Sequence, residues 1–443
     1  MGQTIIIIGG GIVGVSAGLQ LQRDGYQVRL IDRKQPGRET SYGNAGVLSD
    51  SSVMVLNNPG LVKNLPKLLL GRSNALRYDL GFVLRRIGWV ARFLAHCRPG
   101  HMHHAARALR ALLTMSQAQH KRWIAEAGAD HLLKTDGGWL KLFRTEKGFA
   151  NYQAEMDLMR SVGVQFTVYE AAEIRQMEPA LMPRYHKAVM MDDTAAISSP
   201  ADLTDAYVAM FVAAGGVVET ASVTGVAPDG DGRWQVTCDG GASFDADKLV
   251  LAAGAWSAEI AAWLGYDIPM AWERGYHQHL APADGPRLRQ PIYDVEGGFV
   301  IAPMRQGMRV TSGVEITDRD APPEFRQITK AVALAKDVVS LGTPVEDEPW
   351  MGRRPTLVDS LPMIGPAPRH ANLWFNFGHQ HIGLSMGPGS ALILAAQIAG
   401  TPPPIDAAPF RVDRFAVLVC PLCGFRANTT GISPAQVLGF FWP

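Results

Sequence analysis

The amino-acid sequence predicts an α/β fold in which a Rossmann-like domain is interleaved with a second, β-rich domain. Three observations predict this fold: a strand, glycine-rich turn, helix and second strand at the N-terminal end, a run of β segments between residues 217 and 252, and a strand followed by an apolar helix near residue 380. The 443 residues are 47% hydrophobic and 19% charged, so the chain can build two or three folded cores. This composition also excludes a mainly disordered chain.

The N-terminal segment has the pattern of a complete βαβ unit. An apolar strand is predicted over 4–8, a helix runs to about Arg23, and a second strand over 27–31 ends at Asp32. The turn between the first strand and the helix is rich in glycine, as a tight strand-to-helix connection requires. The unit therefore predicts the first half of a dinucleotide-binding domain.

Each residue of this turn has a chemical reason to be there. Gly9, Gly11 and Gly14 have the G-x-G-x-x-G spacing, in which the first permits the tight turn, the second lets the backbone approach a pyrophosphate, and the third lets the helix pack on the strands. The helix N-terminus offers free N–H groups to phosphates. Asp32 follows the second strand, where a carboxylate accepts hydrogen bonds from ribose hydroxyls. Glycine-rich loops without a ligand also show this spacing, but the two strands and the acid favour dinucleotide binding.

Two segments favour a flavin over a nicotinamide dinucleotide. After the second strand the chain continues with 36–49, which is rich in small and hydroxyl residues and is either a ligand-facing segment or an ordinary polar loop. The three β segments of 217–252 then form a meander with turns at 229–232 and 239–241, and the last strand ends in a glycine turn at Gly254. Regular βα repeats are typical of nicotinamide domains, whereas a meander before a returning strand suits a flavoprotein.

The third cofactor signal lies downstream. A strand is predicted over 374–377, a loop over 378–383 and a mostly apolar helix over 384–398. A helix N-terminus stabilises the negative charge that a flavin gains near N1 and the C2 oxygen on reduction. A core helix that follows a glycine-rich loop is the alternative interpretation of the same segment.

Charge and cysteine content exclude several other classes. Forty-two basic and forty-one acidic residues give a net charge of +1, so nucleic acid is not an expected partner. The four cysteines are too few and too scattered to staple the chain, which favours a reducing compartment. We recognise no signal peptide and no apolar run long enough to span a membrane. The expected location is cytoplasmic.

Five motifs occur in the order GGGIVGVSAG, ETSYGNAG, LVLAAGAW, WMGRRPTLVDSLPMIG and FGHQHIGLSMGPGS. In this order the chain resembles the FAD-dependent D-amino-acid oxidase and dehydrogenase family, the DAO family, and is most similar to its bacterial D-amino-acid dehydrogenase branch. The resemblance covers about residues 4–415. It implies an FAD-binding domain built from 1–94, 186–266 and 350–415, a substrate domain built from 95–185 and 267–349, and a tail, 416–443, of unknown role.

The resemblance also implies the cofactor site. The matching positions, which would contact the ADP half, the flavin ring or the segment between them, are Gly9, Gly11, Gly14, Asp32, Arg33, Thr40, Ser41, Asn44, Ala45, Gly46, Val223, Gly254, Gly383, Leu384 and Ser385. Relatives that attach flavin covalently use a cysteine near the RP motif, and 352–355 contains none. Noncovalent FAD is therefore expected.

An amino-acid substrate presents a carboxylate, which a planar guanidinium recognises with two parallel hydrogen bonds. Arg309 and Arg354 match positions that hold the substrate carboxylate in amine-oxidising relatives, and Tyr276 is a weaker match for a hydroxyl that covers the substrate. A surface charge or a structural ion pair is the alternative role for each arginine. His379 and His381 flank the predicted flavin-facing loop and are candidates either for proton transfer or for structural hydrogen bonding.

The implied activity is oxidative deamination of a D-amino acid to a 2-keto acid and ammonia. A hydride passes from the substrate to flavin N5, and a quinone or another respiratory carrier then takes the electrons. Within the same class, the alternative is an oxygen-using oxidase of glycine, sarcosine or a cyclic amino acid such as proline or hydroxyproline. From another class, the alternative is a flavin-binding scaffold subunit without turnover.

Two segments remain outside this assignment. Residues 61–98 carry eight basic residues against one acid, with apolar residues at helical spacing, which suits either peripheral contact with the inner face of the cell membrane or a solvated helix. Cys420 and Cys423 form half of a zinc-type pair without a second half, so no metal is expected.

Overall fold

The predicted first strand lies at the centre of a six-stranded sheet in the computed structural model, which describes residues 2–63, 76–135, 137–415, 417–419 and 426–428. The sheet order is β10-β2-β1-β14-β23-β22, and every neighbouring pair is parallel except β23 with β22. Its strands are β1 (Thr4–Ile8), β2 (Gln27–Asp32), β10 (Val217–Thr220), β14 (Lys248–Leu251), β22 (Met363–Pro366) and β23 (Leu373–Phe377). This sheet confirms the predicted Rossmann-like α/β fold.

The apolar run of β1 is explained by burial on both faces of the sheet. Ile5 and Ile7 pack under helices α1 (Ile12–Arg23), α12 (Gly383–Ile398), α5 (Pro99–Glu126) and α9 (Pro200–Ala213). Ile6 and Ile8 pack on the opposite side, against helix α10 (Ser257–Trp263) and the meander β11 (Val223–Pro228), β12 (Trp234–Cys238) and β13 (Ser243–Ala246). Because successive side chains point to opposite faces, a central parallel strand covered on both sides is apolar throughout.

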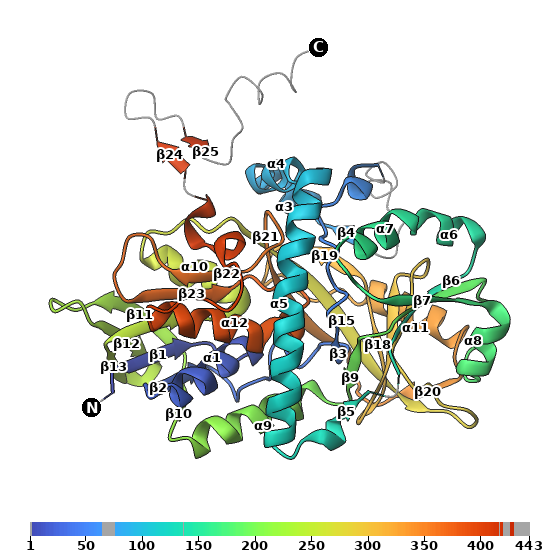
Figure 1. Ribbon diagram of the computed structural model, residues 1–443, viewed down its shortest axis with the longest axis horizontal. Coiled ribbons are helices and arrows are strands. Elements are labelled where there is room, and N and C mark those ends of the chain that lie inside the picture. The colour runs from blue at the N-terminus through green and yellow to red at the C-terminus, as the bar shows by residue number, and fades with distance from the viewer. Residues whose placement is uncertain (1, 64–75, 136, 416, 420–425, 429–443) are drawn as a thin grey trace, which may run out of the picture.

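A larger sheet forms the second, β-rich part of the molecule (Figure 1). It has eleven strands among the described residues and packs against α8 (Ala171–Met177) and α11 (Arg326–Lys336). Its strands are β4 (Leu76–Tyr78), β6 (Trp139–Phe143), β7 (Phe166–Glu170), β8 (Lys187–Met191), β15 (Met270–Pro282), β16 (Ile292–Asp294), β17 (Phe299–Met304), β18 (Gly307–Thr311), β19 (Val314–Ile316), β20 (Leu341–Pro344) and β21 (Trp350–Leu357). A small sheet of β3 (Val47–Leu48), β9 (Ala195–Ile197) and β5 (Leu133–Lys134) lies between the two parts of the chain.

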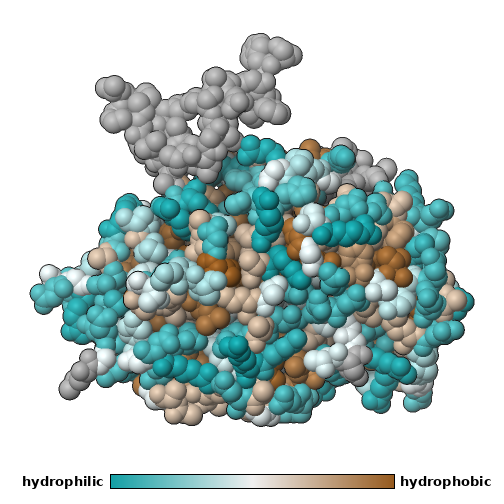
Figure 2. Space-filling view, viewed as in Figure 1, coloured by the Kyte–Doolittle hydropathy of each residue, from teal (hydrophilic) through white to brown (hydrophobic). Residues whose placement is uncertain are grey.

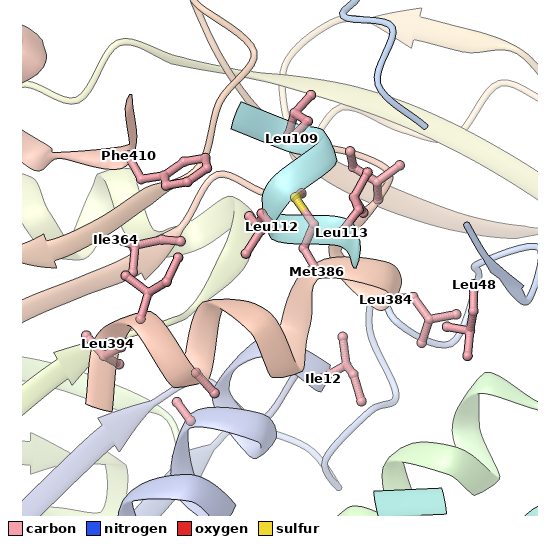
Figure 3. Packing of buried hydrophobic residues seen from close by; sticks show 14 of the residues in the cluster. Ile12, Leu48, Leu109, Leu112, Leu113, Ile364, Leu384, Met386, Leu394 and Phe410 are labelled. Carbon is pink, nitrogen blue, oxygen red and sulfur yellow. The ribbon is translucent and has the colours of Figure 1, made fainter. Parts of the chain in front are cut away.

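The long helix α5 lies between the six-stranded sheet and the eleven-stranded sheet (Figure 1). Figure 3 shows its Leu112 and Leu113 next to Met386 of α12. These leucines are buried in the same cluster as β1 and α1. The apolar face of α5 therefore belongs to the Rossmann-like core, although its sequence lies within 95–185.

The packing differs from the predicted division of the chain at three further places. Strands β4 and β21 hydrogen-bond within the large sheet, to β19 and β15, although both fall in segments assigned to the Rossmann-like domain. Strand β8 is also part of the large sheet. The physical reason is that a strand belongs to the sheet whose edge it pairs with, and pairing partners far apart in sequence leave no local signal.

Besides strand β4, the described part of the basic segment 61–98 contains two short helices within residues 80–95. These are α3 (Leu80–Arg85) and α4 (Ile87–Ala95), separated at Arg86, whose φ of −110° and ψ of 27° interrupt the helix. Phe82 and Phe93 are buried, whereas Leu84 and Ile87 are more than half exposed. Residues 64–75 lie outside the described residues, as do Cys420 and Cys423.

The remaining described helices are α6 (Glu146–Asn151) and α7 (Gln153–Ser161), and short strands β24 (Val417–Val419) and β25 (Arg426–Asn428) pair with each other. No helix in the described part of the chain is both long and apolar enough to cross a membrane. Figure 2 shows one face of the molecule as mainly hydrophilic with scattered hydrophobic areas. The same described residues contain no cluster of three histidine, cysteine or acidic side chains arranged for a metal ion.

Candidate functional site

A cavity of about 320 Å³ lies at the carboxyl ends of β1, β2 and β14. In parallel α/β sheets this edge is where ligands bind, because loops and helix N-termini converge there. The predicted cofactor residues that line the cavity are Gly9, Gly11, Asp32, Arg33, Thr40, Ser41, Asn44, Val223, Gly254, Gly383 and Leu384. The fold thus brings together segments that are more than 300 residues apart in the sequence.

The three glycines of the first turn have different surroundings. Gly9 has a φ of +112°, and a Cβ there would lie 2.4 Å from the carbonyl oxygen of Ala252, so only glycine fits. A Cβ at Gly14 would lie 1.9 Å from the carbonyl oxygen of Gly9, so Gly14 permits close packing and does not line the cavity. A Cβ at Gly11 would meet only Ser41 Oγ, at 3.4 Å. Gly11 is therefore open to the cavity, as an approach of its backbone to a ligand requires.

Two helices begin at the wall of this cavity. Helix α1 follows Gly11, and helix α12 follows Ile382. Neither of these two residues accepts a hydrogen bond from the helix with its side chain. The first turn of each helix also lacks an acidic residue. One N–H group of α1, that of Ile12, donates to Ser41 Oγ at 3.0 Å. The positive ends of both helix dipoles therefore favour negative charge in the cavity. This arrangement fits the pyrophosphate and the reduced flavin of FAD.

Asp32 lies at the end of β2, where the sequence predicts it. Its Oδ2 accepts a hydrogen bond of 2.6 Å from the Gly10 N–H, and its Oδ1 accepts one of 2.9 Å from the Lys34 N–H. Burial raises the pKa of Asp32, and these two backbone hydrogen bonds counteract the rise. The carboxylate is thus fixed in position and keeps lone pairs for ribose hydroxyls. Arg33 beside it pairs with Glu39 at 2.7 Å and lies 3.8 Å from the ring centroid of Trp256.

Asn376 is a cavity residue that the sequence did not identify. It lies on β23, is buried, and lines the cavity, yet neither its Nδ2 nor its Oδ1 has a hydrogen-bond partner among the described residues. A buried amide without partners costs about 1–3 kcal/mol, so such groups are usually satisfied by a ligand or water. Asn376 therefore fits a group with donors and acceptors of its own. The only sequence signal for Asn376 was its position in the predicted strand 374–377. The pattern of a strand does not show which of its two faces lies against a cavity.

A second cavity, of about 380 Å³, adjoins the first. Thr40, Asn44 and His381 line both cavities. The second is otherwise lined mainly by strands of the large sheet and the segments between them, including Trp139, Tyr293 and Trp350. A ligand in the first cavity and one in the second would thus meet at these three shared residues.

Arg354 lines the second cavity, as predicted for a residue that holds a carboxylate. Its guanidinium lies directly against the backbone of Gly275. A Cβ at that position would be 2.3 Å from Arg354 Nη2, so only glycine leaves room for the guanidinium. Within the described residues the guanidinium has neither a hydrogen bond nor an ion pair within 4 Å. Burial lowers the pKa of Arg354, and the charge of Glu273 counteracts this. An arginine without a direct partner at a cavity wall is equipped to bind an anion.

Arg309 does not have the predicted role. It lies outside both cavities and is 1% exposed. Its Nη1 donates to the carbonyl oxygens of Tyr42 and Asn44 at 2.7 and 2.5 Å, and its Nε donates to His279 Nε2 at 3.0 Å. The hydrogen bonds of this guanidinium are therefore used to hold the chain around residue 43, which corrects its assignment to the substrate carboxylate.

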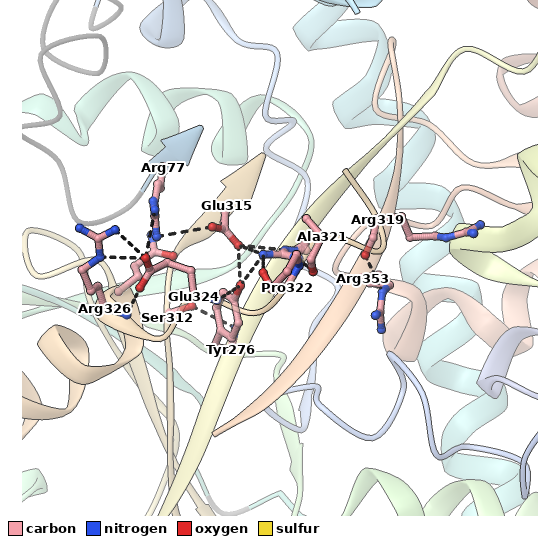
Figure 4. A network of polar contacts seen from close by, with 12 residues as sticks. Arg77, Tyr276, Ser312, Glu315, Arg319, Ala321, Pro322, Glu324, Arg326 and Arg353 are labelled. Carbon is pink, nitrogen blue, oxygen red and sulfur yellow. Dashed lines mark hydrogen bonds and ion pairs between the residues drawn. The ribbon is translucent and has the colours of Figure 1, made fainter. Parts of the chain in front are cut away.

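Tyr276 lines the second cavity, but its hydroxyl is engaged elsewhere (Figure 4). The hydroxyl donates to Glu315 and accepts from Arg274 Nη2 at 3.0 Å and from the Glu324 N–H at 3.2 Å. Burial, and the hydrogen bond to Glu315, raise the pKa of Tyr276 to about 12. The ring can contact a ligand, whereas the predicted covering hydroxyl belongs to a structural network.

The two histidines differ in surroundings. His379 is buried, and its Nε2 lies 2.8 Å from Ser390 Oγ. His381 lines both cavities. Burial lowers the pKa of His379 to about 3, whereas His381 is exposed at the cavity wall, and desolvation and the charge of Arg354 lower its pKa. The His379 imidazole is therefore a poor proton acceptor, because an effective general base has a pKa near the working pH.

The other predicted cofactor residues lie close by without lining the first cavity. Ala45 and Ser385 line the second cavity. Gly46 lines neither, and its φ of +70° and the carbonyl oxygen of Ile197, 2.1 Å from the place of a Cβ, give it a structural role. Asn44 connects the two ligand-facing segments, since its Nδ2 donates to the carbonyl oxygen of His381 at 3.1 Å.

Comparison with known proteins agrees with this geometry. A family model described as DAO, FAD dependent oxidoreductase, matches residues 4–397. A D-amino-acid oxidase of Bradyrhizobium diazoefficiens is 31% identical over 425 residues, which cover 94% of this chain and 99% of the relative. D-amino acid dehydrogenase 2 of Ralstonia nicotianae is 29% identical over 446 residues, which cover 93% of this chain and all of the relative, 100%. The crystal structure of glycine oxidase from Geobacillus kaustophilus has the same fold, with a TM-score of 0.70, 22% identity and coverage of 93% of this chain and 99% of that one.

Proposed function

The chain belongs to the DAO family of FAD-dependent oxidoreductases, and from this premise we propose that it deaminates D-amino acids oxidatively to 2-keto acids and ammonia. FAD is its cofactor, and the two adjoining cavities provide separate places for the cofactor and the substrate. We propose that the cofactor is held noncovalently, in keeping with the finding that neither of the described cysteines, Cys97 and Cys238, lines either of these two cavities.

The observation that carries this proposal is the guanidinium of Arg354. It faces the second cavity without a direct partner among the described residues, close to His381 at the boundary with the first. A substrate carboxylate bound there would place the attached Cα and amine near the shared wall of Thr40 and Asn44. Holding a substrate at such a boundary supplies most of what the protein must add to the reaction, since orientation alone lowers the barrier by several kcal/mol.

When bound, FAD supplies the oxidant that accepts a hydride from Cα, and the imine that remains is hydrolysed by water. The residues of this chain orient the substrate and do not need to move its proton. Because burial lowers the pKa of His379 to about 3, this imidazole is a poor acceptor for the proton of a substrate ammonium at neutral pH. Loss of the amine proton to solvent before the hydride leaves is therefore part of the proposal.

We propose a quinone or another respiratory carrier as the electron acceptor. The match to a dehydrogenase of Ralstonia nicotianae supports this choice, whereas the match to an oxidase of Bradyrhizobium diazoefficiens favours oxygen as the second candidate. Following reoxidation of the reduced enzyme distinguishes the two. Rapid reoxidation by a soluble quinone under nitrogen, with slow reoxidation by air, is the expected result.

Anaerobic flavin spectra test the reaction itself. Bleaching of the flavin by D-amino acids, and not by their L-forms, is expected; bleaching by glycine, sarcosine or proline alone would support an oxidase of those substrates. No bleaching by any amine would mean a flavin-binding scaffold. Arg354→Lys is expected to weaken substrate binding at least tenfold, since lysine cannot make two parallel hydrogen bonds. Arg326→Lys, at an arginine whose side chain is 80% exposed, is the control.

We also propose that helices α3 and α4 contact an anionic membrane surface. Leu80, Leu84 and Ile87 are each more than half exposed there, and basic residues such as Arg85 and Arg86 flank them. Sedimentation with anionic vesicles at low salt should recover the protein, and the double substitution Leu84→Ser, Ile87→Ser should reduce that recovery strongly. Val345→Ser, at another exposed apolar residue, is the control. A wild-type protein that ignores the vesicles would refute this contact.

A further inference from the structure

The far wall of the second cavity is aromatic. Trp139 of β6, Tyr293 of β16 and Phe299 of β17 line it, and all three come from neighbouring strands of the large sheet. None of them is among the residues predicted to bind a substrate. Arg354 comes from β21, which is separated from these strands in the order of the sheet. The cavity is therefore aromatic at this wall as well as beside Arg354, where Trp350 of β21 and Tyr276 of β15 line it.

Trp139 and Tyr293 form a pair within this wall. Their ring centroids are 6.2 Å apart, with an interplanar angle of 32°. Strands β6 and β16 pair in parallel, with Tyr293 opposite Lys141, and the Lys141 ammonium lies 5.0 Å from the centroid of the Trp139 ring. Lys141 is itself held by Tyr152 and Glu155, at 2.6 and 2.9 Å. The sheet and this network brace the pair, so it forms a preorganised surface.

The pair also carries polar groups that nothing in the described structure satisfies. The Nε1 atom of Trp139 is buried and has no hydrogen-bond partner there. The Tyr293 hydroxyl likewise has no hydrogen bond within the described residues, and burial raises the pKa of Tyr293 to about 12, so it remains a donor at neutral pH. The Nε1 atom of Trp139 is fully buried and is therefore closed off from the cavity, so the Tyr293 hydroxyl is the available donor at this wall and favours a ligand that ends in an acceptor.

We propose that this site selects amino acids whose side chain is bulky and ends in a hydrogen-bond acceptor, that the Trp139 ring contacts this side chain, and that the Tyr293 hydroxyl recognises its end. The proposal rests on the proposed function, because it takes Arg354 as the carboxylate site. A cavity of about 380 Å³ is far larger than glycine needs, and glycine would leave the aromatic wall uncovered. Each additional buried methylene group increases affinity about fourfold, so the wall discriminates strongly in favour of a side chain that covers it.

The test uses the FAD-loaded enzyme and three amino acids that differ stepwise. Glycine has no side chain, D-phenylalanine has a ring, and D-tyrosine has the ring and a terminal oxygen. Flavin reduction is followed anaerobically to obtain the reduction rate and the substrate dissociation constant separately. In the wild type, D-tyrosine is expected to exceed glycine at least a hundredfold in rate over dissociation constant, and D-phenylalanine about tenfold.

Tyr293→Phe keeps a ring in the wall and removes the hydroxyl. It should reduce the preference for D-tyrosine over D-phenylalanine from about tenfold to less than threefold, mostly through the dissociation constant. Tyr169→Phe is a matched control, because the Tyr169 hydroxyl also has no hydrogen-bond partner in the described structure but Tyr169 lines neither cavity. That variant should retain the wild-type preference.

A second readout does not depend on turnover. Acetate, phenylacetate and 4-hydroxyphenylacetate present the same carboxylate with a growing substituent and cannot be deaminated, and their binding is followed by perturbation of the flavin spectrum. Binding that strengthens in this order supports the inference, even if no amino acid bleaches the flavin and the proposed reaction is wrong. Equal binding of acetate and 4-hydroxyphenylacetate, or equal reduction by glycine and D-tyrosine, would overturn the inference while leaving amine oxidation intact.

Discussion

The Nη1 atom of Arg309 donates a hydrogen bond of 2.7 Å to the carbonyl oxygen of Tyr42. A second bond reaches the carbonyl oxygen of Asn44, so strand β18 of the large sheet holds a segment whose residues Thr40 and Asn44 line both cavities. His279 completes the arrangement, since its Nε2 accepts from Arg309 and its Nδ1 contacts Glu346. Arg309 is thus a positioning residue for the boundary between the two cavities.

Arg309→Lys should therefore disturb this segment more than a change of charge would. Lysine keeps the positive charge but cannot reach both carbonyl oxygens and His279 together, which leaves buried acceptors unpaired. We expect the free energy of unfolding to fall by about 2–4 kcal/mol, with weaker FAD binding. Urea unfolding and flavin release by dialysis measure the two effects. Arg326→Lys, on the surface, should change neither, and an unaltered Arg309→Lys protein would contradict this role.

Gly11→Ala and Gly14→Ala should separate cofactor binding from folding. The methyl group at Gly11 projects toward the cavity, whereas at Gly14 it would lie 1.9 Å from the carbonyl oxygen of Gly9. We expect Gly11→Ala to unfold at the wild-type temperature without FAD but to bind FAD at least tenfold more weakly. Gly14→Ala should lose several kcal/mol of stability even without FAD, because backbone must move. Similar melting temperatures for the two apoproteins would refute this distinction.

Asn376→Leu tests whether the unpaired amide serves the cofactor. Replacing a buried amide that lacks partners with an apolar group of similar size should leave the apoprotein as stable or more stable, by about 1 kcal/mol. FAD binding should weaken about tenfold, since hydrogen bonds to the cofactor are lost. Titration of the apoprotein with FAD, together with thermal unfolding, gives both numbers. Undiminished FAD affinity would show that Asn376 has no part in binding.

His120 should make the stability of the protein depend on pH. It is fully buried on α5, with Nδ1 2.7 Å from the Tyr207 hydroxyl and Nε2 2.8 Å from the carbonyl oxygen of Leu384 at the start of α12. Burial lowers the pKa of His120 to about 4, whereas an unfolded histidine has a pKa of about 6.5. The unfolded state therefore binds more protons between these values, so stability is highest above pH 6.5 and falls toward pH 4.

The expected loss from His120 is about 2 kcal/mol between pH 6.5 and pH 5. Urea unfolding of the FAD-loaded protein at several pH values measures it. His120→Gln removes the titrating group while retaining a donor and an acceptor, so this variant should lose less stability over the same interval. A parallel decline in wild type and variant would assign the effect to other histidines, such as His379, whose pKa is also lowered.

Local pattern was sufficient for the cofactor half of the site. The strand and turn of 4–14, the acid at Asp32 and the helix after Gly383 could all be predicted, because phosphate-binding backbone and helix termini are specified by residues adjacent in the sequence. Asn376 escaped this reasoning, since the face of a strand that meets a cavity depends on distant segments. For the same reason, nothing local in 95–185 showed that helix α5 would pack on the Rossmann-like core.

The sequence by itself determined the Rossmann-like fold and the glycine-rich strand-to-helix turn, and its resemblance to a family supplied two arginines as candidates for a carboxylate site. Only the tertiary structure decided between those arginines: backbone carbonyl oxygens from 42 and 44 engage Arg309, while Arg354 remains without a direct partner in the described structure. Whether a charged side chain is free depends on acceptors brought to it by other segments. Spacing along the chain records which residues are present, and packing determines which of them can still bind a ligand.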